Sequence, residues 1–264
     1  MLPYTATAIE SFNKLVPLAP EERTQLTSLL RNRRNLRPRA TLVERGNPQS
    51  NLLFILAGWV AEYRLLANGK RQILYIGLPG EVVAAQDLFY PSALLSIEAL
   101  SPCVVASIDV SSLANEGPSL SKLRDALILG AVRRNAILQE WMISIGRRTG
   151  FQRVAALLIE LTVRLRMRGL SSGNSTYCPL RQQDIADATG LTGPYVNQIL
   201  KKMRRVGWLD IVNGCLVIKS EALLIKAAEF NADYLKFPRS EVALKSWTNR
   251  DPLSAQEKSV QQIG

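Results

Sequence analysis

Residues 182–205, QQDIADATGLTGPYVNQILKKMRR, constrain the fold of this chain more than any other segment. This stretch predicts two short helices joined by a tight turn. Ala186 is small where a second helix would cross the first, and Gly190 can adopt the left-handed backbone that ends a helix. Thr192 is a candidate N-cap, and Pro194 is suited to a first helical turn. The pattern is typical of a helix-turn-helix unit.

The second helix of this unit has one apolar face and one polar, cationic face. Apolar side chains recur at i, i+3, i+4 and i+7, at Val196, Ile199, Leu200 and Met203. The other face carries side chains that can contact DNA, namely Tyr195, Asn197, Gln198, Lys201, Lys202 and Arg205. An ordinary helix pair with a solvated basic face would show the same spacing. The segment that follows favours the DNA-binding interpretation.

That segment, WLDIVNGCLVIKS, predicts two strands. They lie on either side of Asn213-Gly214, a pair that favours a two-residue hairpin turn. A hairpin directly after a recognition helix is the wing of a winged helix-turn-helix domain. Residues 170–177 are predicted to be a loop and residues 220–235 a closing helix. Residues 237–264 are polar enough to form a flexible tail.

The positive charge of the chain is concentrated around the predicted helix pair. The formal net charge is +11. Between residues 119 and 206 there are fifteen Lys and Arg against five Asp and Glu, so a surplus of ten lies in this segment. A concentrated basic surplus beside a helix-turn-helix pattern is the electrostatic footprint of a protein that binds the phosphate backbone. Double-stranded DNA is therefore the predicted partner.

The residue types that the chain lacks exclude several kinds of chemistry. It contains no histidine, which excludes a Ser-His-Asp triad, His-based acid–base catalysis and His ligation of haem or zinc. Its three cysteines, Cys103, Cys178 and Cys215, are far apart and match no zinc or iron–sulfur spacing. We therefore expect no enzymatic activity, no cofactor and no metal site.

The sequence also predicts a location. No apolar run reaches the length of a membrane span, and the longest candidates are interrupted by Arg or Asp. The first residues, MLPYTATAIESFNKL, lack the charged-then-apolar plan of a signal peptide. We expect a cytoplasmic protein with no membrane partner.

Short β-type runs separated by turn signals occupy most of the first half of the chain. Residues 1–18 are predicted to be a loosely held arm, and Pro20 to open a short helix, PEERTQLTSLL. Asn68-Gly69 favours a hairpin between two of the runs. Strands at this close spacing predict a small barrel or roll. The predicted strands are residues 41–44, 52–56, 60–66, 72–76 and 104–108.

A long helix is predicted over residues 119–149. Its apolar stripe could pair with a second copy of the chain or pack on the chain's own β-domain, and the spacing favours neither. A further helix is predicted over residues 151–169, with Gly169 as its C-cap. The stripe on the long helix follows an approximately heptad spacing through Leu120, Leu123, Leu127, Ile137, Trp141 and Ile145, interrupted by Gly130 and Arg134.

This order of arm, β-roll, long helix and winged helix-turn-helix resembles that of the Crp/Fnr family of bacterial transcription regulators. The resemblance covers about residues 15–235. Its most specific segments are IGRRTGFQRVAALLIELTVRLRMRGL at 145–170 and PLRQQDIADATGLTGPYVNQILKKMRRVGWL at 179–209, with GLPGE at 77–81 as a weaker one. It implies an α+β fold with a cyclic-nucleotide-binding-like β-roll (a jelly roll) in residues 1–118, a dimerisation helix in 119–149, a Crp-type winged helix-turn-helix DNA-binding domain in 150–235 and a C-terminal tail in 236–264.

The resemblance also implies a function. A homodimer joined through residues 119–149 would bind a two-fold-symmetric operator, with half-sites roughly 34 Å, one helical turn, apart. The family also allows RNA polymerase as a partner. Two alternatives stay open at this stage. One is a regulator that needs no effector, in which the β-roll only supports the dimer. The other is a small-ligand sensor that acts mainly through protein contacts and has a degenerate DNA-binding domain.

The β-roll departs from the cyclic-nucleotide-binding members of the family. In those members an Arg and a small residue, shortly after the Gly-Glu pair, clamp the cyclic phosphate. Here that stretch is YPSALLSIEALSP, and no Lys or Arg occurs between Arg71 and Lys122. Gly80 and Glu81 are candidate ligand-binding residues, since Glu81 could accept a hydrogen bond from a ribose hydroxyl. A buried phosphate without a cation would be destabilised, so we expect no tight binding of cyclic AMP, and the effector is unknown.

The predicted recognition helix departs as well. Members of the cyclic-AMP type carry Arg-Glu early in this helix and a second Arg four residues after the Glu, and such arginines contact guanine bidentately. The matching positions here are Gly193-Pro194 and Gln198, so we expect a different operator, because Gln pairs with adenine. Asn197 could instead brace the turn, and Arg204 and Arg205 could simply be solvated. The predicted base contacts are Gln198, Tyr195 and Asn197, with Lys201 at a base or the backbone; the predicted phosphate or positioning contacts are Gln182, Gln183, Thr192 and Lys202.

Overall fold

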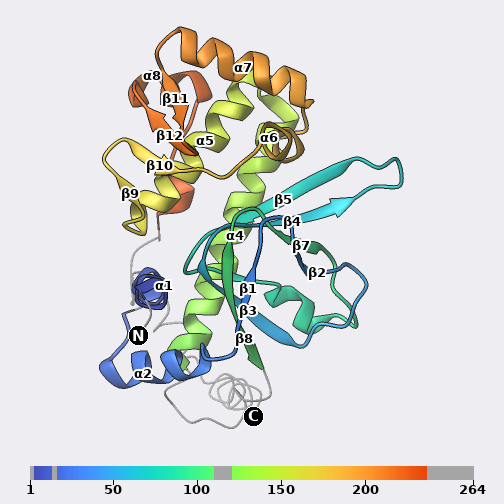
Figure 1. Ribbon diagram of the computed structural model, residues 1–264, viewed down its shortest axis with the longest axis vertical. Helices are drawn as coiled ribbons and strands as arrows, with labels where there is room; N and C mark the ends of the chain where they lie inside the picture. Colours follow the sequence, from blue (N-terminus) through green and yellow to red (C-terminus); the bar gives the residue numbers. More distant parts are fainter. Residues whose placement is uncertain (1–2, 14–16, 110–120, 237–264) are drawn as a thin grey trace, which may run out of the picture.

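The computed structural model describes residues 3–13, 17–109 and 121–236. In Figure 1 the β-roll lies beside the lower part of a long helix, and the C-terminal domain lies around its upper end. No helix within the described ranges is long and apolar enough to cross a bilayer. The elements of the first half are α1 (Pro3–Asn13), α2 (Pro20–Leu29), β1 (Arg33–Leu36), β2 (Thr41–Val43), β3 (Asn51–Ala57), β4 (Val60–Leu65), β5 (Arg71–Gly77), β6 (Val82–Val83), the 3-10 helix η1 (Ala85–Phe89), β7 (Ser96–Ala99) and β8 (Cys103–Asp109).

The β-roll consists of two four-stranded antiparallel sheets with the strand orders β1-β8-β3-β6 and β2-β7-β4-β5. All five strands predicted from the sequence are present, and Gly69 turns the β4–β5 hairpin with a positive φ of 77°. Strands β1, β6 and β7 were not predicted. β6 has only two residues, and β1 reads RRNL, too short and too polar to show an apolar alternation.

The prediction of a loosely held arm is wrong for residues 3–13, which form helix α1. Ala8, Ile9 and Phe12 are buried. The rings of Phe12 and Phe54, on β3, lie 5.6 Å apart between centroids. These three side chains share one face of a helix, so α1 covers apolar surface of the β-roll that would otherwise meet water. Helix α2 begins at Pro20, as predicted.

Helix α4 (Ser121–Arg147) is the long helix, and α5 (Gly150–Met167) packs against it. Ile137 and Trp141 of α4 are buried in the core that contains the apolar face of α5. For these two residues, packing within the chain is therefore the correct alternative. Gly169 follows the end of α5 with a positive φ of 73°, one residue beyond the C-cap position. Of the remaining predicted stripe, Leu127 is half-buried, Ile145 is exposed, and Leu120 and the side chain of Leu123 lie outside what the structure describes.

The C-terminal domain is the predicted winged helix-turn-helix. Gly190 has the left-handed φ of 67° that the turn between its two helices requires. Asn213 and Gly214 both have positive φ, as a tight hairpin demands. The domain contains α6 (Gln182–Thr189), α7 (Gly193–Arg205), α8 (Glu221–Ala228), the 3-10 helix η3 (Asp233–Leu235), and strands β9 (Ser171–Ser172), β10 (Ser175–Tyr177), β11 (Leu209–Val212) and β12 (Cys215–Ile218) in the order β11-β12-β10-β9.

Two predictions in this domain need correction. Residues 170–177 are not a loop, because β9 and β10 extend the sheet of the wing. Their Ser, Gly, Asn and Thr residues gave no apolar alternation, although Thr176 is buried opposite Leu216. The closing helix is also shorter than predicted, since α8 ends at Ala228 and only a 3-10 turn follows. The predicted tail, residues 237–264, lies outside the described residues.

The docking of α1 can be tested by removing its largest buried side chain. Phe12→Ala is expected to lower the free energy of unfolding by about 3–5 kcal/mol, because it deletes a buried ring and leaves a cavity. Urea denaturation measures this change. The exposed Glu10 on the same helix provides a control, and Glu10→Ala is expected to stay within about 0.5 kcal/mol of the parent. Equal stability of the two variants would mean that α1 is not packed on the β-roll in solution.

Candidate nucleic-acid interface

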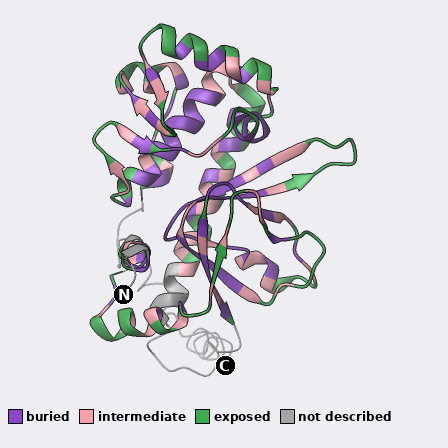
Figure 2. Cartoon of the chain, in the orientation of Figure 1, coloured by how far each residue is buried: buried purple, intermediate pink, exposed green. Residues whose placement is uncertain are grey.

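Helix α7 has one side buried in the domain core and one side exposed on the surface. Val196, Ile199, Leu200 and Met203 are all buried, as the sequence pattern predicted. At 3.6 residues per turn, the side directly opposite them carries Pro194, Gln198, Lys201 and Arg205. All four of these residues are exposed. In Figure 2, α7 shows this exposed face along the upper edge of the molecule.

Asn197 and Arg204 lie on the flank of α7 that faces α6 and the wing. Asn197 Oδ1 accepts a hydrogen bond of 3.3 Å from Gln182 Nε2, so Asn197 links the two helices of the unit. Arg204 lies 3.8 Å from Asp210 of the wing strand β11. Both residues also line an open groove between α6, α7 and β11. Asn197 is thus placed to brace the turn, which was the second of its two interpretations.

Tyr195 and Lys202 lie on the opposite flank, next to the start of α5. Lys202 Nζ is 5.5 Å from the centre of the Phe151 ring. The ring of Tyr195 lies directly over Gly150, where an added Cβ would be only 2.5 Å from Tyr195 Cε1. Only glycine therefore fits at position 150 without moving the tyrosine. Sequence reasoning missed this role of Gly150.

The other predicted contacts lie at the beginnings of the two helices. Gln182 and Gln183 are exposed in the first turn of α6, and Gln183 Nε2 donates to Asp187 Oδ1 at 2.6 Å. Thr192 is exposed at the N-cap position of α7, but its side chain makes no capping hydrogen bond. These polar groups are therefore on the surface and near the amino ends of helices, where phosphates bind favourably.

Two acidic residues of α6 are neutralised by the β-roll. Asp184 is buried and accepts hydrogen bonds from Arg39 Nη2 at 2.6 Å and from Arg71 Nη2 at 2.7 Å. Arg71 Nε also donates to Asp187 at 2.6 Å, and Glu98 bridges the two arginines at 3.0 Å each. Burial acts to raise the pKa of Asp184, but hydrogen bonds from Arg39, the Arg181 backbone and Arg71 outweigh it and lower that pKa. We call these five residues, Arg39, Arg71, Glu98, Asp184 and Asp187, the hairpin clasp.

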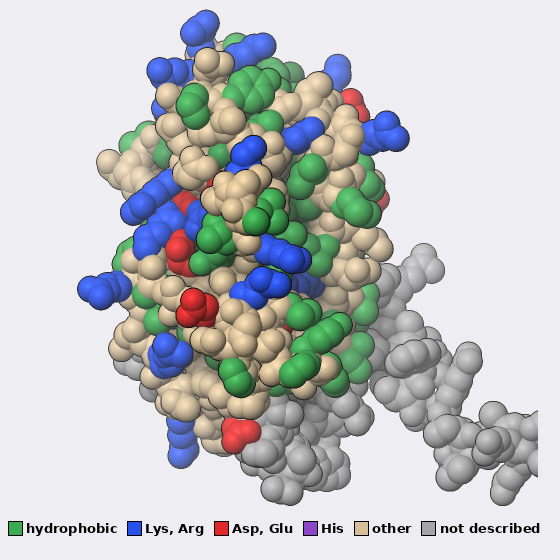
Figure 3. Space-filling view, turned by 90° about the vertical axis from the view of Figure 1, so that its right-hand side faces the viewer, with side chains coloured by type: hydrophobic (Ala, Val, Ile, Leu, Met, Phe, Trp, Pro, Cys, Tyr) green, Lys and Arg blue, Asp and Glu red, His purple; other side chains and the backbone are tan. Residues whose placement is uncertain are grey.

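The clasp removes the negative charge of α6 from the neighbourhood of the cations on α7. Lys201, Lys202, Arg204 and Arg205 are exposed on α7, whereas both aspartates of α6 are paired and buried. Figure 3 shows Lys and Arg side chains gathered at the upper end of the molecule, where this domain lies. A cationic surface around an exposed helix face suits the phosphates that flank a DNA groove.

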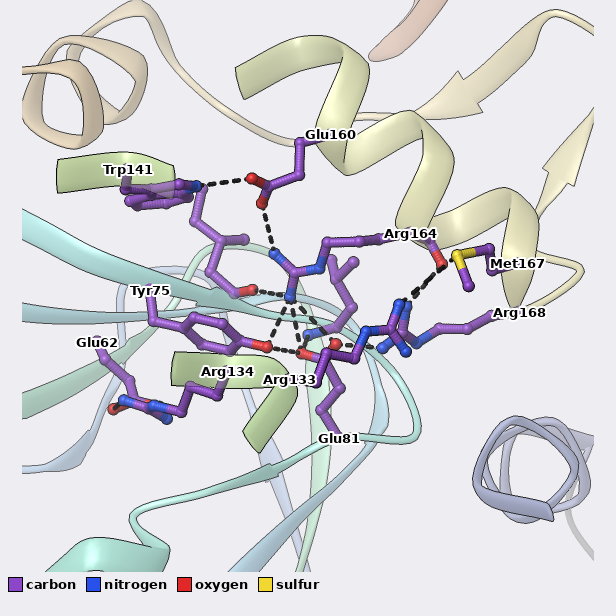
Figure 4. A network of polar contacts seen from close by, with 12 residues as sticks. Glu62, Tyr75, Glu81, Arg133, Arg134, Trp141, Glu160, Arg164, Met167 and Arg168 are labelled. Carbon is purple, nitrogen blue, oxygen red and sulfur yellow. Dashed lines mark hydrogen bonds and ion pairs between the residues drawn. The ribbon is translucent and has the colours of Figure 1, made fainter. Parts of the chain in front are cut away.

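Glu81 is also paired within the chain (Figure 4). Its carboxylate accepts from Arg164 Nη2 at 2.9 Å, from Tyr75 Oη at 3.0 Å and from the Leu78 backbone N–H at 3.0 Å, and it is also bound by Arg168. Burial would raise the pKa of Glu81, but the charges of Arg164 and Arg168 outweigh it and lower that pKa to about 2. Glu81, a candidate ligand residue, is therefore held by arginines of the C-terminal domain. Gly80 beside it forms a turn with a φ of 86°.

A further buried ion pair joins the β-roll to α4. Arg134 of α4 forms a two-pronged pair with Glu62 of β4, which is fully buried. The guanidinium groups of Arg134 and Arg164 lie 4.6 Å and 4.8 Å from the centre of the Tyr75 ring.

Within the described parts of the chain, no group of three His, Cys, Asp or Glu side chains is placed to hold a metal ion.

Comparison with known proteins agrees with this architecture. Residues 33–116 match the family model for the cyclic nucleotide-binding domain, and residues 152–227 match that for the Crp-like helix-turn-helix domain. The nitrogen fixation regulation protein FixK of Bradyrhizobium diazoefficiens is 32% identical over 165 residues, which are 61% of this chain and 66% of that protein. The anaerobic regulatory protein of Pasteurella multocida is 23% identical over 212 residues, which are 79% and 76% of the two chains.

Solved structures with the same fold include FixK2 from Bradyrhizobium japonicum, with a TM-score of 0.65 and 25% identity over 76% of this chain and 98% of that one. Another is TTHB099, a transcriptional regulator of the CRP family from Thermus thermophilus, with a TM-score of 0.62 and 19% identity over 76% and 99%. A winged helix-turn-helix domain that follows a β-roll of this kind in the chain defines a DNA-binding transcription regulator. The chain belongs to the Crp/Fnr family of such regulators.

Proposed function

We propose that this regulator binds a two-fold-symmetric operator as a homodimer and reads base edges mainly with Gln198 and Lys201. The outward stripe of α7 supports this assignment most directly, because its side chains point away from the domain core and are exposed. Arg205 belongs to the same stripe and is added as a third groove contact. Tyr195 and Asn197, on the flanks, are assigned to the groove edges.

Contacts to the phosphate backbone are assigned to polar groups at the sides of α7. Lys202 lies on one flank, and Gln182, Gln183 and Thr192 lie at the starts of α6 and α7. Such contacts position a protein on the duplex without reading its sequence. The intact helix pair, turn and wing argue against a sensor with a degenerate DNA-binding domain. RNA polymerase is a proposed partner on the basis of the family alone.

Exposed apolar side chains on α4 support the homodimer. Ile128, Val132 and Met142 are 41%, 57% and 70% exposed. Together with the exposed Asn135 they follow a heptad-like spacing along the side of α4 opposite Ile137 and Trp141, which pack within the chain. A helix of 27 residues with such a seam is suited to pair with a second copy of itself. The seam proposed for the dimer therefore shares no residue with the stripe predicted from the sequence.

The proposed regulator does not respond to cyclic AMP. The acceptor group of Glu81 is already bound by Arg164 and Arg168, and the pair Glu62–Arg134 lies between the β-roll and α4. A cyclic nucleotide would have to break these buried pairs, which is strongly unfavourable. The packing therefore favours a regulator that binds DNA without an effector.

Calorimetric titration of the purified protein with cyclic AMP tests this assignment. We expect no saturable heat at micromolar nucleotide, because the arginines beside Glu81 and Glu62 are already paired with these buried carboxylates. Binding in the low-micromolar range would contradict the proposal.

Two substitutions on α7 separate base reading from backbone contact. On the site that the parent protein enriches from random duplexes, Gln198→Ala is expected to lose about 1–3 kcal/mol and to relax the preference at one base pair. Lys202→Ala is expected to weaken binding to all sequences alike and to reduce the salt slope by about one charge. Gel-shift titrations at several salt concentrations measure both effects. An unchanged base preference for Gln198→Ala would show that other residues read the sequence.

The proposed dimer seam can be tested with one buried charge. Met142→Glu would place two carboxylates against each other at the seam, so the protein is expected to become monomeric and to lose tight binding to a two-fold site. Sedimentation velocity measures the change in mass. The control is Leu66→Glu, which makes the same kind of change at an exposed apolar residue just beyond β4. A Met142→Glu protein that stays dimeric would rule out this seam.

A further inference from the structure

Arg164 is a fully buried arginine, with no exposed surface on its side chain. It projects from α5, in the C-terminal domain, into the β-roll (Figure 4). Its Nη2 atom donates to Glu81 at 2.9 Å, to Tyr75 Oη at 2.9 Å and to the Ile76 carbonyl at 2.7 Å. Its Nη1 atom donates to Glu160 Oε1 at 3.2 Å. One guanidinium therefore joins α5 to the β5–β6 turn.

The network continues from Arg164 to the long helix. Glu160 accepts a hydrogen bond from Trp141 Nε1 of α4 at 2.9 Å and from Tyr234 Oη at 2.8 Å. On the other side, Arg168 binds both Glu81 and the Arg164 carbonyl. The β-roll, α4 and the DNA-binding domain thus meet at a single set of buried charges. Moving α5 away from the β-roll would take both Arg164 and Arg168 from Glu81, which strongly disfavours any partial separation.

The position of Glu81 gives this contact a further meaning. Glu81 is the last residue of the segment GLPGE. In the nucleotide-binding pattern, the carboxylate at this position is free to accept a hydrogen bond from an effector. Here both of its oxygens bind arginines of the DNA-binding domain. The DNA-binding domain therefore occupies the hydrogen-bonding groups that an effector would otherwise use.

The hairpin clasp is a second, separate contact between the same two bodies. Arg39 and Arg71 of the β-roll hold Asp184 at the start of α6, whereas Arg164 lies near the end of α5. One contact would allow the domain to pivot, whereas two contacts at different elements resist rotation. The direction in which α7 points is then determined by the chain itself.

We propose that Arg164 is a positioning residue that acts as a built-in ligand of the β-roll. By binding Glu81 it holds the DNA-binding domain, and so the recognition helix of each protomer, at the orientation that matches the spacing of two half-sites. This inference rests on the proposed two-fold binding by a homodimer. The contact replaces an effector in setting that orientation.

The test compares Arg164→Met with Arg166→Met, a matched change on the same helix at a partly exposed arginine that pairs with Glu221. Each purified protein is titrated with a single half-site duplex, with the full operator, and with operators whose half-site spacing is changed by a few base pairs. Simultaneous engagement of two sites can raise affinity on the order of 10²–10⁴-fold when the geometry matches.

Arg164→Met is expected to bind the half-site within about twofold of the parent, since α7 is untouched, but to lose about tenfold or more on the full operator. It is also expected to discriminate poorly between spacings. Arg166→Met is expected to match the parent throughout. Glu81→Gln, which removes the partner without altering α5, is expected to behave like Arg164→Met, and it provides the decisive comparison if Arg164→Met fails to fold.

The inference is overturned if Arg164→Met, or Glu81→Gln in its place, retains full-operator affinity and spacing preference. It is equally overturned if half-site binding falls as much as full-site binding, because that loss would reflect damage to the domain itself. A parent protein that binds a half-site as tightly as the full operator would instead reject the proposed two-fold binding, and this inference with it.

Discussion

The buried pair of Glu81 and Arg164 is the interaction on which the arrangement of this protein depends. Neither charge has solvent to stabilise it, so Glu81 depends on Arg164 and Arg168, and Arg164 depends on Glu81 and Glu160. Because Glu81 belongs to the β-roll and both Arg164 and Arg168 belong to the DNA-binding domain, separation of the two bodies would take both arginines away from Glu81. The low pKa of Glu81 reflects the same dependence. Docking of the domains is therefore a condition for burying this network at all.

The hairpin clasp shows how the β-roll can influence DNA binding from a distance. Asp184 and Asp187 lie on the helix before the recognition helix, where unpaired carboxylates would repel phosphates. Arg39 and Arg71 pair with them, so the clasp both steadies α6 and removes negative charge next to the basic face of α7. The β-roll thus supports the electrostatics of the interface through these two arginines.

The parts of the fold that local patterns specify were predictable from the sequence. The spacing of Val196, Ile199, Leu200 and Met203, the left-handed Gly190 and the Asn213-Gly214 turn identified the winged domain and the buried face of its recognition helix. Helix α1 and strands β9 and β10 were missed, because short polar segments acquire their structure from what they pack against. Helix α4 has two apolar faces, one buried within the chain and one exposed. Spacing alone could not show that Ile137 and Trp141 belong to the buried face and not to the exposed seam.

The charged networks could not be predicted for a related reason. Arg71 and Asp184 are more than a hundred residues apart, and Arg164 lies eighty-three residues from Glu81. Pairs at such separations leave no periodic signal, and a lone Arg within an apolar helix face resembles a solvated one. Glu81 was recognised only as a candidate acceptor. That its partners come from the DNA-binding domain follows from the fold.

The most direct test of this account is selection of bound sequences from random duplex DNA by the purified protein, with and without a pool of cell metabolites. If the chain's own arginines orient the recognition helices, the protein alone should enrich one two-fold-symmetric site with half-sites about one helical turn apart. The metabolites should not change that site or its enrichment. Enrichment that appears only when metabolites are present would contradict the account.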